Sequence, residues 1–186
     1  MSSSAVINEV STLLRALLED GLKSPANLNP SVELSNPADE TDEKTLSIWL
    51  YQVTPNPYLR NIPNVRTSDE GERFPPLSLD LCYLLTPSLK NESANQATLG
   101  RALQVLYDNS ILTLHSGDDV EELHLNICQR SITELAEVWE ALQKPYRLSA
   151  CFEVRMVQID SERVLPAGRV RERSVQFKEK PVEAIA

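Results

Sequence analysis

Apolar residues recur along the chain with two different periods, and each period predicts one type of element. In the first twenty residues they fall three and four positions apart, which is the spacing of one face of an amphipathic helix. The apolar positions of this helix are Val6, Val10, Leu13, Leu14, Leu17 and Leu18. Gly21 follows them and is expected to end the helix. The same spacing returns in residues 93–107 and predicts a second helix there.

Other segments carry the patterns of β-strands. Residues 46–54 are apolar at both alternating sets of positions, which is typical of a strand covered on both faces. Residues 77–85, 123–127 and 147–159 alternate apolar and polar side chains, and this pattern predicts strands with one buried face. A further short strand is expected at residues 32–34.

A third helix is predicted from its N-terminal cap. Ser131 and Glu134 have the spacing of a capping box, in which each side chain accepts a hydrogen bond from the backbone N–H of the other residue. Pro145 is expected to end the segment, because proline cannot continue a helix. The residues expected to be buried are Leu135, Val138, Trp139 and Leu142.

Two segments rich in proline separate these elements. Residues 24–44 are also rich in asparagine, serine and acidic residues, and we expect a loop there. Residues 55–76 contain five of the twelve prolines, and we interpret them as an ordered but irregular loop.

The order helix, strand, strand, helix, strand, helix, strand predicts an α+β fold. We expect a single domain, residues 1–160, with a mostly antiparallel sheet of four or five strands and helices packed largely on one face. Residues 161–186 differ, because they hold six Lys or Arg against four Asp or Glu in a chain of net charge −9. We predict that they form an extended C-terminal arm, which pairs with the sheet edge of another chain. A frayed terminus is the alternative interpretation.

Composition narrows the classes of function. The 186 residues include 18 Lys or Arg and 27 Asp or Glu, a balance that argues against nucleic acid as a partner. No apolar run approaches the roughly 20 residues that cross a bilayer, and the first residues lack the pattern of a signal peptide. The three cysteines are an odd number without paired spacing, as expected for reduced thiols in a protein made in the cytoplasm.

Candidate catalytic chemistry is sparse. The five glycines are too scattered for a loop that binds phosphate. Cys82, Cys128 and Cys151 all fall in strand patterns, where thiols usually act as small core residues. Adding His124 gives a set of metal-ligand type, but four residues of strand separate His124 from Cys128 by about 13 Å, too far for one zinc ion. We therefore predict no catalytic, cofactor-binding or metal-binding residues.

Four segments, taken together in this order, resemble the tail-terminator or cap proteins of extracellular contractile injection systems. They are LYQVTPNPYLRN (residues 50–61), PLSLDLCYLLT (76–86), LGRALQVL (99–106) and PYRLS (145–149). The similarity covers about residues 5–160. Such systems are particles similar to phage tails, with an inner tube, a contractile sheath, a baseplate and a distal cap.

The resemblance implies a non-enzymatic structural protein that needs no cofactor. It implies a homo-oligomer, a ring of six copies, seated on the last layer of inner-tube and sheath protein at the end distal to the baseplate. Such a cap stops polymerisation and fixes particle length. No insertion into a membrane is implied. Because each copy carries a net charge of −9, we expect ring assembly to depend on salt.

Two sets of residues are expected to make the contacts. The arm would fill unpaired strand edges of the sheath, and its basic residues would face an acidic sheath surface. The turn after the strand at residues 46–54 would contact the ring or the tube, although it could equally be a turn that only ends a buried strand. The arm residues are Arg169, Val170, Arg171, Arg173, Val175 and Phe177. The turn residues are Gln52, Thr54, Asn56, Tyr58, Arg60 and Asn61.

Two other classes of function stay open at this point. One is an acidic adaptor or assembly chaperone that binds a basic partner without forming a ring. The other is a small enzyme with an acid–base pair made by Asp80 and Glu153, together with the cysteines.

Overall fold

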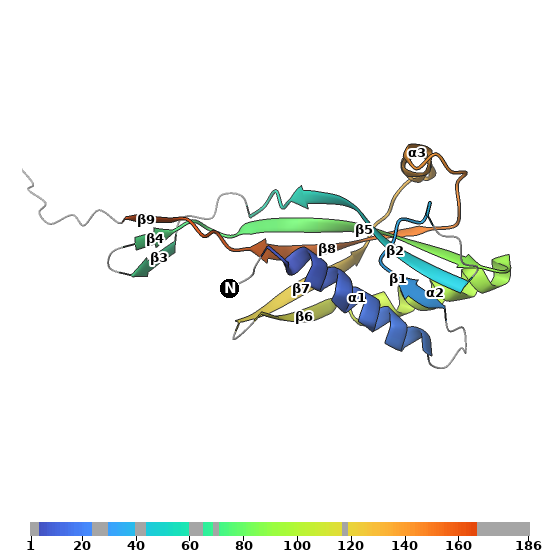
Figure 1. The fold of residues 1–186 in the computed structure, drawn as a ribbon, viewed down its shortest axis with the longest axis horizontal. Helices are drawn as coiled ribbons and strands as arrows, with labels where there is room; N and C mark the ends of the chain where they lie inside the picture. Colours follow the sequence, from blue (N-terminus) through green and yellow to red (C-terminus); the bar gives the residue numbers. More distant parts are fainter. Residues whose placement is uncertain are drawn as a thin grey trace, which may run out of the picture.

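The computed structural model describes residues 4–23, 30–39, 44–59, 65–68, 71–116 and 119–166. They form three helices, one sheet of six strands, and a sheet of three strands that extends from one end of the larger sheet (Figure 1). This is the α+β class that the sequence predicts. The elements in chain order are α1 (Val6–Lys23), β1 (Ser31–Glu33), β2 (Lys44–Pro55), β3 (Val65–Ser68), β4 (Gly71–Arg73), β5 (Leu77–Leu89), α2 (Glu92–Asp108), β6 (Ile111–Ser116), β7 (Asp119–Ile127), α3 (Ile132–Ala141), β8 (Ala150–Ile159) and β9 (Val164–Pro166).

The larger sheet has the strand order β1-β2-β5-β8-β7-β6. Its neighbouring strands are antiparallel except β1 and β2, which run parallel. The sheet is therefore mixed, with four antiparallel pairs and one parallel pair where a mostly antiparallel sheet was expected, and it has six strands instead of about four or five. The sequence interpretation overlooked β6, which forms a hairpin with β7.

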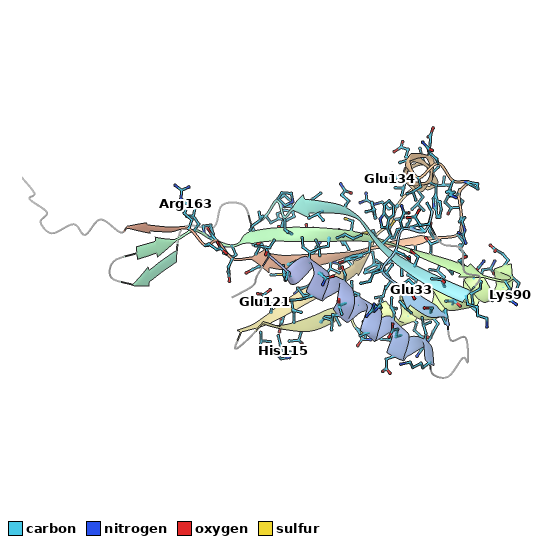
Figure 2. All side chains as sticks on the ribbon, viewed as in Figure 1. Glu33, Lys90, His115, Glu121, Glu134 and Arg163 are labelled. Carbon is cyan, nitrogen blue, oxygen red and sulfur yellow. The ribbon has the colours of Figure 1, made fainter. Side chains whose placement is uncertain are left out.

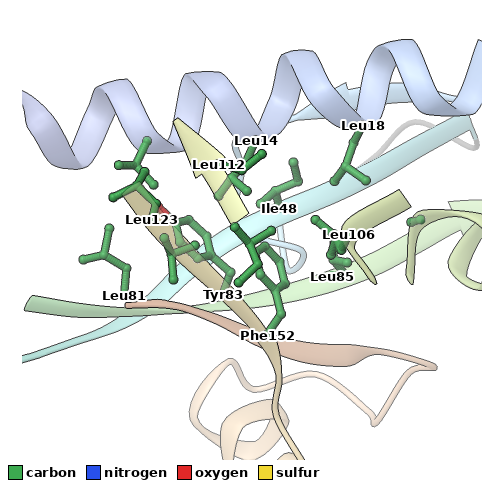
Figure 3. Close-up of a cluster of buried hydrophobic side chains, with 14 of the residues drawn as sticks. Leu14, Leu18, Ile48, Leu81, Tyr83, Leu85, Leu106, Leu112, Leu123 and Phe152 are labelled. Carbon is green, nitrogen blue, oxygen red and sulfur yellow. The ribbon is translucent and has the colours of Figure 1, made fainter. Parts of the chain in front are cut away.

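Helices α1 and α2 lie on one face of this sheet, as expected for helices packed largely on one face, and α3 lies on the other face. The side chains of α1 and α2 pack together with strands β2, β5, β6, β7 and β8 in one apolar core. Figure 3 shows part of this core, with Leu14 and Leu18 of α1 facing Ile48 and Tyr83 of the sheet. A smaller cluster around Trp139 joins α3 to the opposite face.

Gly21 does not end the first helix, which continues to Lys23. A Cβ atom at Gly21 would lie 2.5 Å from Cγ2 of Val105 on α2. The Arg101 side chain of α2 also donates a hydrogen bond to the Gly21 carbonyl at 3.0 Å. Gly21 therefore allows α1 and α2 to approach closely, and this is the physical reason for a glycine here.

The strand predicted to have one buried face, β5, is buried on both faces. Its apolar set, which includes Leu81 and Tyr83, faces α1 and α2. The alternate set is also buried, and it consists of Ser78, Asp80, Cys82, Leu84 and Thr86. The polar residues of this set led the sequence pattern to suggest a face in water. Conversely, β2 is buried in its first half only and becomes more exposed toward Pro55.

A polar contact lies inside the larger core. The Tyr83 ring stacks on Phe152 with ring centroids 5.2 Å apart. Its hydroxyl lies 2.9 Å from the Ser11 hydroxyl of α1, which donates its own hydrogen to the Ile7 carbonyl. Tyr83 is therefore the donor in the pair with Ser11. Burial raises the pKa of Tyr83 to about 12.

The capping box of α3 is confirmed. The Ser131 side chain accepts a hydrogen bond from the Glu134 backbone N–H, and the Glu134 carboxylate accepts one from the Ser131 backbone N–H. The Ser131 backbone N–H and hydroxyl, followed by the Arg130 guanidinium, donate to the Glu134 carboxylate and hold its pKa below the ordinary value. Trp139 is fully buried and donates to the Ser149 hydroxyl at 3.2 Å. The other residues expected to be buried in this helix are half-buried: Leu135, Val138 and Leu142.

The three-stranded sheet has the order β3-β4-β9. It lies in segments that the sequence patterns predict to be a loop and an extended arm. Residues 55–76 are not wholly irregular, because β3 and β4 form a hairpin within them. Residues 164–166 lie within the expected arm of residues 161–186 and pair with β4 of the same chain, whereas the residues expected to pair with another chain begin at Arg169. Residues 167–186 lie outside the described residues.

Candidate interaction site

The residues expected to make contacts begin in the second half of β2, where the sheet has an open edge. β1 pairs only with Thr45, Leu46 and Ser47 of β2. Beyond Ser47, no strand among the described residues pairs with this edge of β2, whereas the other edge pairs with β5 along its length. Open strand edges expose backbone N–H and C=O groups and are ready to pair with another chain.

A bulge changes the direction of side chains in the middle of β2. Leu50 lies opposite Tyr83 of β5 and Gln52 lies opposite Cys82, so Tyr51 has no opposite residue. A bulge of this kind places two consecutive side chains on one face, and Tyr51 and Gln52 both line a pocket of about 140 Å³ beneath α3. The Tyr51 hydroxyl donates to the Cys151 sulfur at 3.8 Å. Burial raises the pKa of Tyr51.

The turn that follows β2 is held by a buried asparagine. Asn56 is only 7% exposed, and its side-chain N–H donates to the two carboxylate oxygens of Asp80 at 3.0 and 3.3 Å. Its backbone N–H donates to the Ser78 carbonyl at 2.9 Å. Its side-chain oxygen accepts from the Tyr58 backbone N–H at 3.0 Å, which closes an Asx turn. Asn56 therefore fixes the turn from a buried position.

Tyr58 lies at the exposed side of this turn. Its side chain is 88% exposed, more than that of any other large hydrophobic residue whose side chain the structure describes. The backbone beneath it is bound to Asn56, so the ring is presented on a fixed support. Exposed aromatic residues on rigid backbone are typical anchors of protein interfaces.

A hollow of about 630 Å³ lies beside the turn, between the ends of β2, β5 and β8. Apolar side chains form most of its wall: Pro55, Leu59, Phe74, Pro75, Pro76, Leu77 and Ile159. Ser78 also lines the hollow, and its buried hydroxyl has no hydrogen-bond partner among the residues that the structure describes. Arg163 lies at the neck between the two sheets (Figure 2), with its guanidinium carbon 4.9 Å from the centroid of the Phe74 ring.

The structure separates the six turn residues that the sequence groups together. Gln52 and Tyr58 are exposed, Thr54 is half-buried and Asn56 is buried. Arg60 and Asn61 lie outside the described residues, as do all six arm residues: Arg169, Val170, Arg171, Arg173, Val175 and Phe177. Sequence reasoning missed the hollow, because its wall comes from three separate parts of the chain.

The two carboxylates considered as an acid–base pair each have a structural partner. Asp80 accepts hydrogen bonds from Asn56, and Glu153 forms an ion pair with Arg155. The three thiols lie on the sheet face that α3 covers, and Cys82 and Cys151 are buried there. Within the part of the chain that the structure describes, no group of three or more His, Cys, Asp or Glu side chains is arranged to hold a metal ion.

Among the described residues, no helix combines the length and the apolar character that crossing a membrane would require.

The sequence matches one protein family, and the fold is similar to two solved structures. Residues 9–173 match the family described as Pvc16 N-terminal domain. The fold is similar to the PVC sheath/tube terminator of an extracellular contractile injection system, in its extended state, with a TM-score of 0.68 and 18% identity over 99% of this chain and 67% of that chain. It is also similar to the tube-terminating cap of the anti-feeding prophage, with a TM-score of 0.61 and 18% identity over 95% of this chain and 62% of that one. No curated protein matches the chain.

Proposed function

The chain belongs to the Pvc16 N-terminal domain family, and we propose that it caps a contractile injection particle by terminating the inner tube and the sheath. One observation carries this proposal: the terminator fold extends over 99% and 95% of the chain in the two comparisons. The similarity therefore includes the open half of β2 and its turn as well as the helix-covered core.

In this proposal, six copies form a ring on the last layer of tube and sheath, at the end distal to the baseplate. The ring stops further addition of subunits and so fixes the length of the particle. The protein does this by binding alone, without a cofactor. The absence of catalysis is supported by the two candidate acid–base residues, because Asp80 is bound by Asn56 and Glu153 by Arg155 in structural contacts.

Strand pairing gives the cap a physical means of ending a polymer. A subunit layer grows while it presents open strand edges to the next layer. Residues 169–177 would add as a strand to the last sheath layer, where backbone hydrogen bonds give affinity and alternate side chains give specificity. The arginines at positions 169, 171 and 173 would orient the arm on an acidic surface and speed its association.

The turn after β2 supplies the second contact, with a neighbouring copy or with the tube. Tyr58 would insert as an aromatic anchor, and the adjacent hollow would receive an apolar side chain of the partner. Asn56 and Asp80 fix the turn before binding, so little conformational entropy is lost on association.

The test uses the full chain, tagged at its N-terminus and expressed with the tube and sheath proteins of its own host. We expect tube and sheath proteins in the eluate, and a tag label at one end of each particle in electron micrographs. Label along the whole particle would identify a sheath or tube component instead. An eluate without particle proteins would contradict the cap function and favour the acidic adaptor.

Tyr58→Ala sharpens this test. Loss of an aromatic anchor typically weakens binding by about 2 kcal/mol or more, which is roughly 30-fold. We therefore expect a large decrease in the fraction of particles that carry label. Tyr107→Ala is the matched control, because Tyr107 is 74% exposed but lies on α2, away from the turn. Equal effects of the two substitutions would contradict the role given to the turn.

A further inference from the structure

Cys128 and Cys151 lie opposite each other where strands β7 and β8 meet the segment that carries α3. The register of the two strands places Asn126 opposite Glu153 and Ile127 opposite Phe152. In the same register, the next pair of opposed residues along the two strands is Cys128 and Cys151. The Cys128 backbone N–H donates to the Cys151 carbonyl at 3.0 Å, so the pairing does extend to this position.

This pairing suits a disulfide bond. Opposed residues that are hydrogen bonded across antiparallel strands have Cα atoms about 5.5 Å apart, within the range of about 4.4–6.8 Å that disulfides span. Their Cβ atoms lie toward the wide end of the range of about 4.5–5.5 Å, because the pair is hydrogen bonded, and they must move roughly 1–2 Å closer to reach the spacing of a disulfide. The position is favourable for that movement, because it lies at the end of the ladder, one residue beyond Ile127 of β7.

The two thiols share one apolar cluster but differ in their exposure to solvent. Both pack in the small cluster beneath α3, which contains Leu84 and Trp139. Cys151 is only 4% exposed, whereas Cys128 is half-buried and can be reached from solvent. The third thiol is less well placed, because Cys82 lies opposite Glu153 on β8, and the residue opposite Cys151 on β5 is Leu84.

We propose that Cys128 and Cys151 are a redox-sensitive pair that forms a disulfide bond when the protein meets a small disulfide such as oxidised glutathione. The Cys128 thiolate attacks one sulfur of oxidised glutathione and releases one glutathione thiolate. The Cys151 thiol loses its proton and attacks the Cys128 sulfur, which releases the second. Two protein thiols are oxidised to one disulfide, and one oxidised glutathione is reduced to two molecules of glutathione.

The disulfide bond would make the segment that carries α3 into a covalently closed loop. The chain leaves the sheet after Cys128 and returns to it at Ala150, where β8 begins, so a disulfide between Cys128 and Cys151 would join the two ends of the segment that carries α3. The thiols stay reduced in a reducing cytoplasm and oxidise outside it. The inference rests on the proposed function at one point: the chain meets an oxidising environment because the particle that it caps leaves the cytoplasm.

The reaction is expected to be slow at neutral pH. Burial and the nearby Glu153 carboxylate raise the pKa of Cys128 to about 12, to which the neighbouring Cys82 and Cys151 thiols contribute while Arg130 opposes them. Because the thiolate is the nucleophile, the first step should accelerate about tenfold per pH unit below that pKa. A slow reaction leaves time for assembly before the α3 segment is closed.

The experiment uses the full chain, purified reduced and then incubated with oxidised glutathione at mildly alkaline pH. We expect peptide mapping under non-reducing conditions to find a Cys128–Cys151 cross-link and a loss of two hydrogen atoms in the intact mass. Cys82 should remain a free thiol, which alkylation after denaturation would detect. Cys82→Ser, the matched control, should form the same bond, and its unfolding midpoint should rise on oxidation and fall again with a reductant.

Other outcomes would overturn the inference. They are a cross-link that includes Cys82, glutathione adducts without a cross-link, or three thiols that all remain open to alkylation. Cys128→Ser must abolish the bond, and because this side chain is half-buried the variant should keep the circular dichroism of the parent. Bond formation in the isolated chain does not depend on capping, so failure of this inference and failure of the proposed function are separately visible.

Discussion

The two faces of the six-stranded sheet differ in what covers them. On one face, α1 and α2 bury a continuous set of leucine, valine and aromatic side chains. On the other, the ten-residue α3 covers a buried cluster of only Leu84, Trp139 and Cys151, next to the buried polar residues of β5. The difference indicates that the first face supplies most of the stability. The second face holds the polar bonds that fix the β2 turn, and it holds the thiols.

The largest expected effect comes from removing a core leucine on the first face. Leu14 on α1 is fully buried, whereas Leu135 on α3 is half-buried. Leu14→Ala should lower the free energy of unfolding by about 3–4 kcal/mol, because lost burial and a residual cavity add. Leu135→Ala should lower it by about 1 kcal/mol. Denaturant unfolding of both variants measures the difference, and equal losses would refute the comparison of the two faces.

A smaller effect is expected at the contact between α1 and α2. Gly21→Ala should destabilise by about 1–3 kcal/mol, because the added Cβ overlaps Val105. Gly100→Ala is the control, since a Cβ there meets nothing within 4 Å and should stabilise α2 by about 0.5–1 kcal/mol. Adding Val105→Ala should reduce the cost of Gly21→Ala, and simple additivity in this double-mutant cycle would contradict the close approach.

The smallest effect is expected at the end of α3. Gln143 has a φ of 55°, in the left-handed region, where glycine is favoured. The bonds Gln143 N–H to Glu140 carbonyl and Lys144 N–H to Trp139 carbonyl form a Schellman motif around it. Gln143→Gly should therefore stabilise the protein by about 1 kcal/mol, seen as a rise of roughly 2–4 °C in the thermal midpoint. A lower midpoint would contradict this assignment.

The sequence predicts those features whose signals are local. The capping box of α3 depends on two residues three positions apart, and it is confirmed. The long helices and the strands β2, β5 and β8 follow from regular apolar spacing. β6 was overlooked although Leu112 and Leu114 alternate with exposed residues, because so short a pattern between a helix and a loop carries little signal.

Features that depend on register could not be predicted in the same way. The role of Asn56 comes from Asp80, which is 24 residues away and reaches it only through the pairing of β2 with β5. The bulge at Tyr51 and the opposition of Cys128 and Cys151 also require the alignment of two strands. A single sequence does not specify that alignment, since a shift of one residue moves every side chain to the other face.

The proposal that the chain ends the polymer is tested most directly by particle length. We would measure the lengths of particles by electron microscopy in a host that lacks this protein, and again after the full chain is supplied. The account predicts a broad distribution, or no stable particles, without the protein and one narrow length with it. Particles of the same narrow length in both hosts would contradict the cap function.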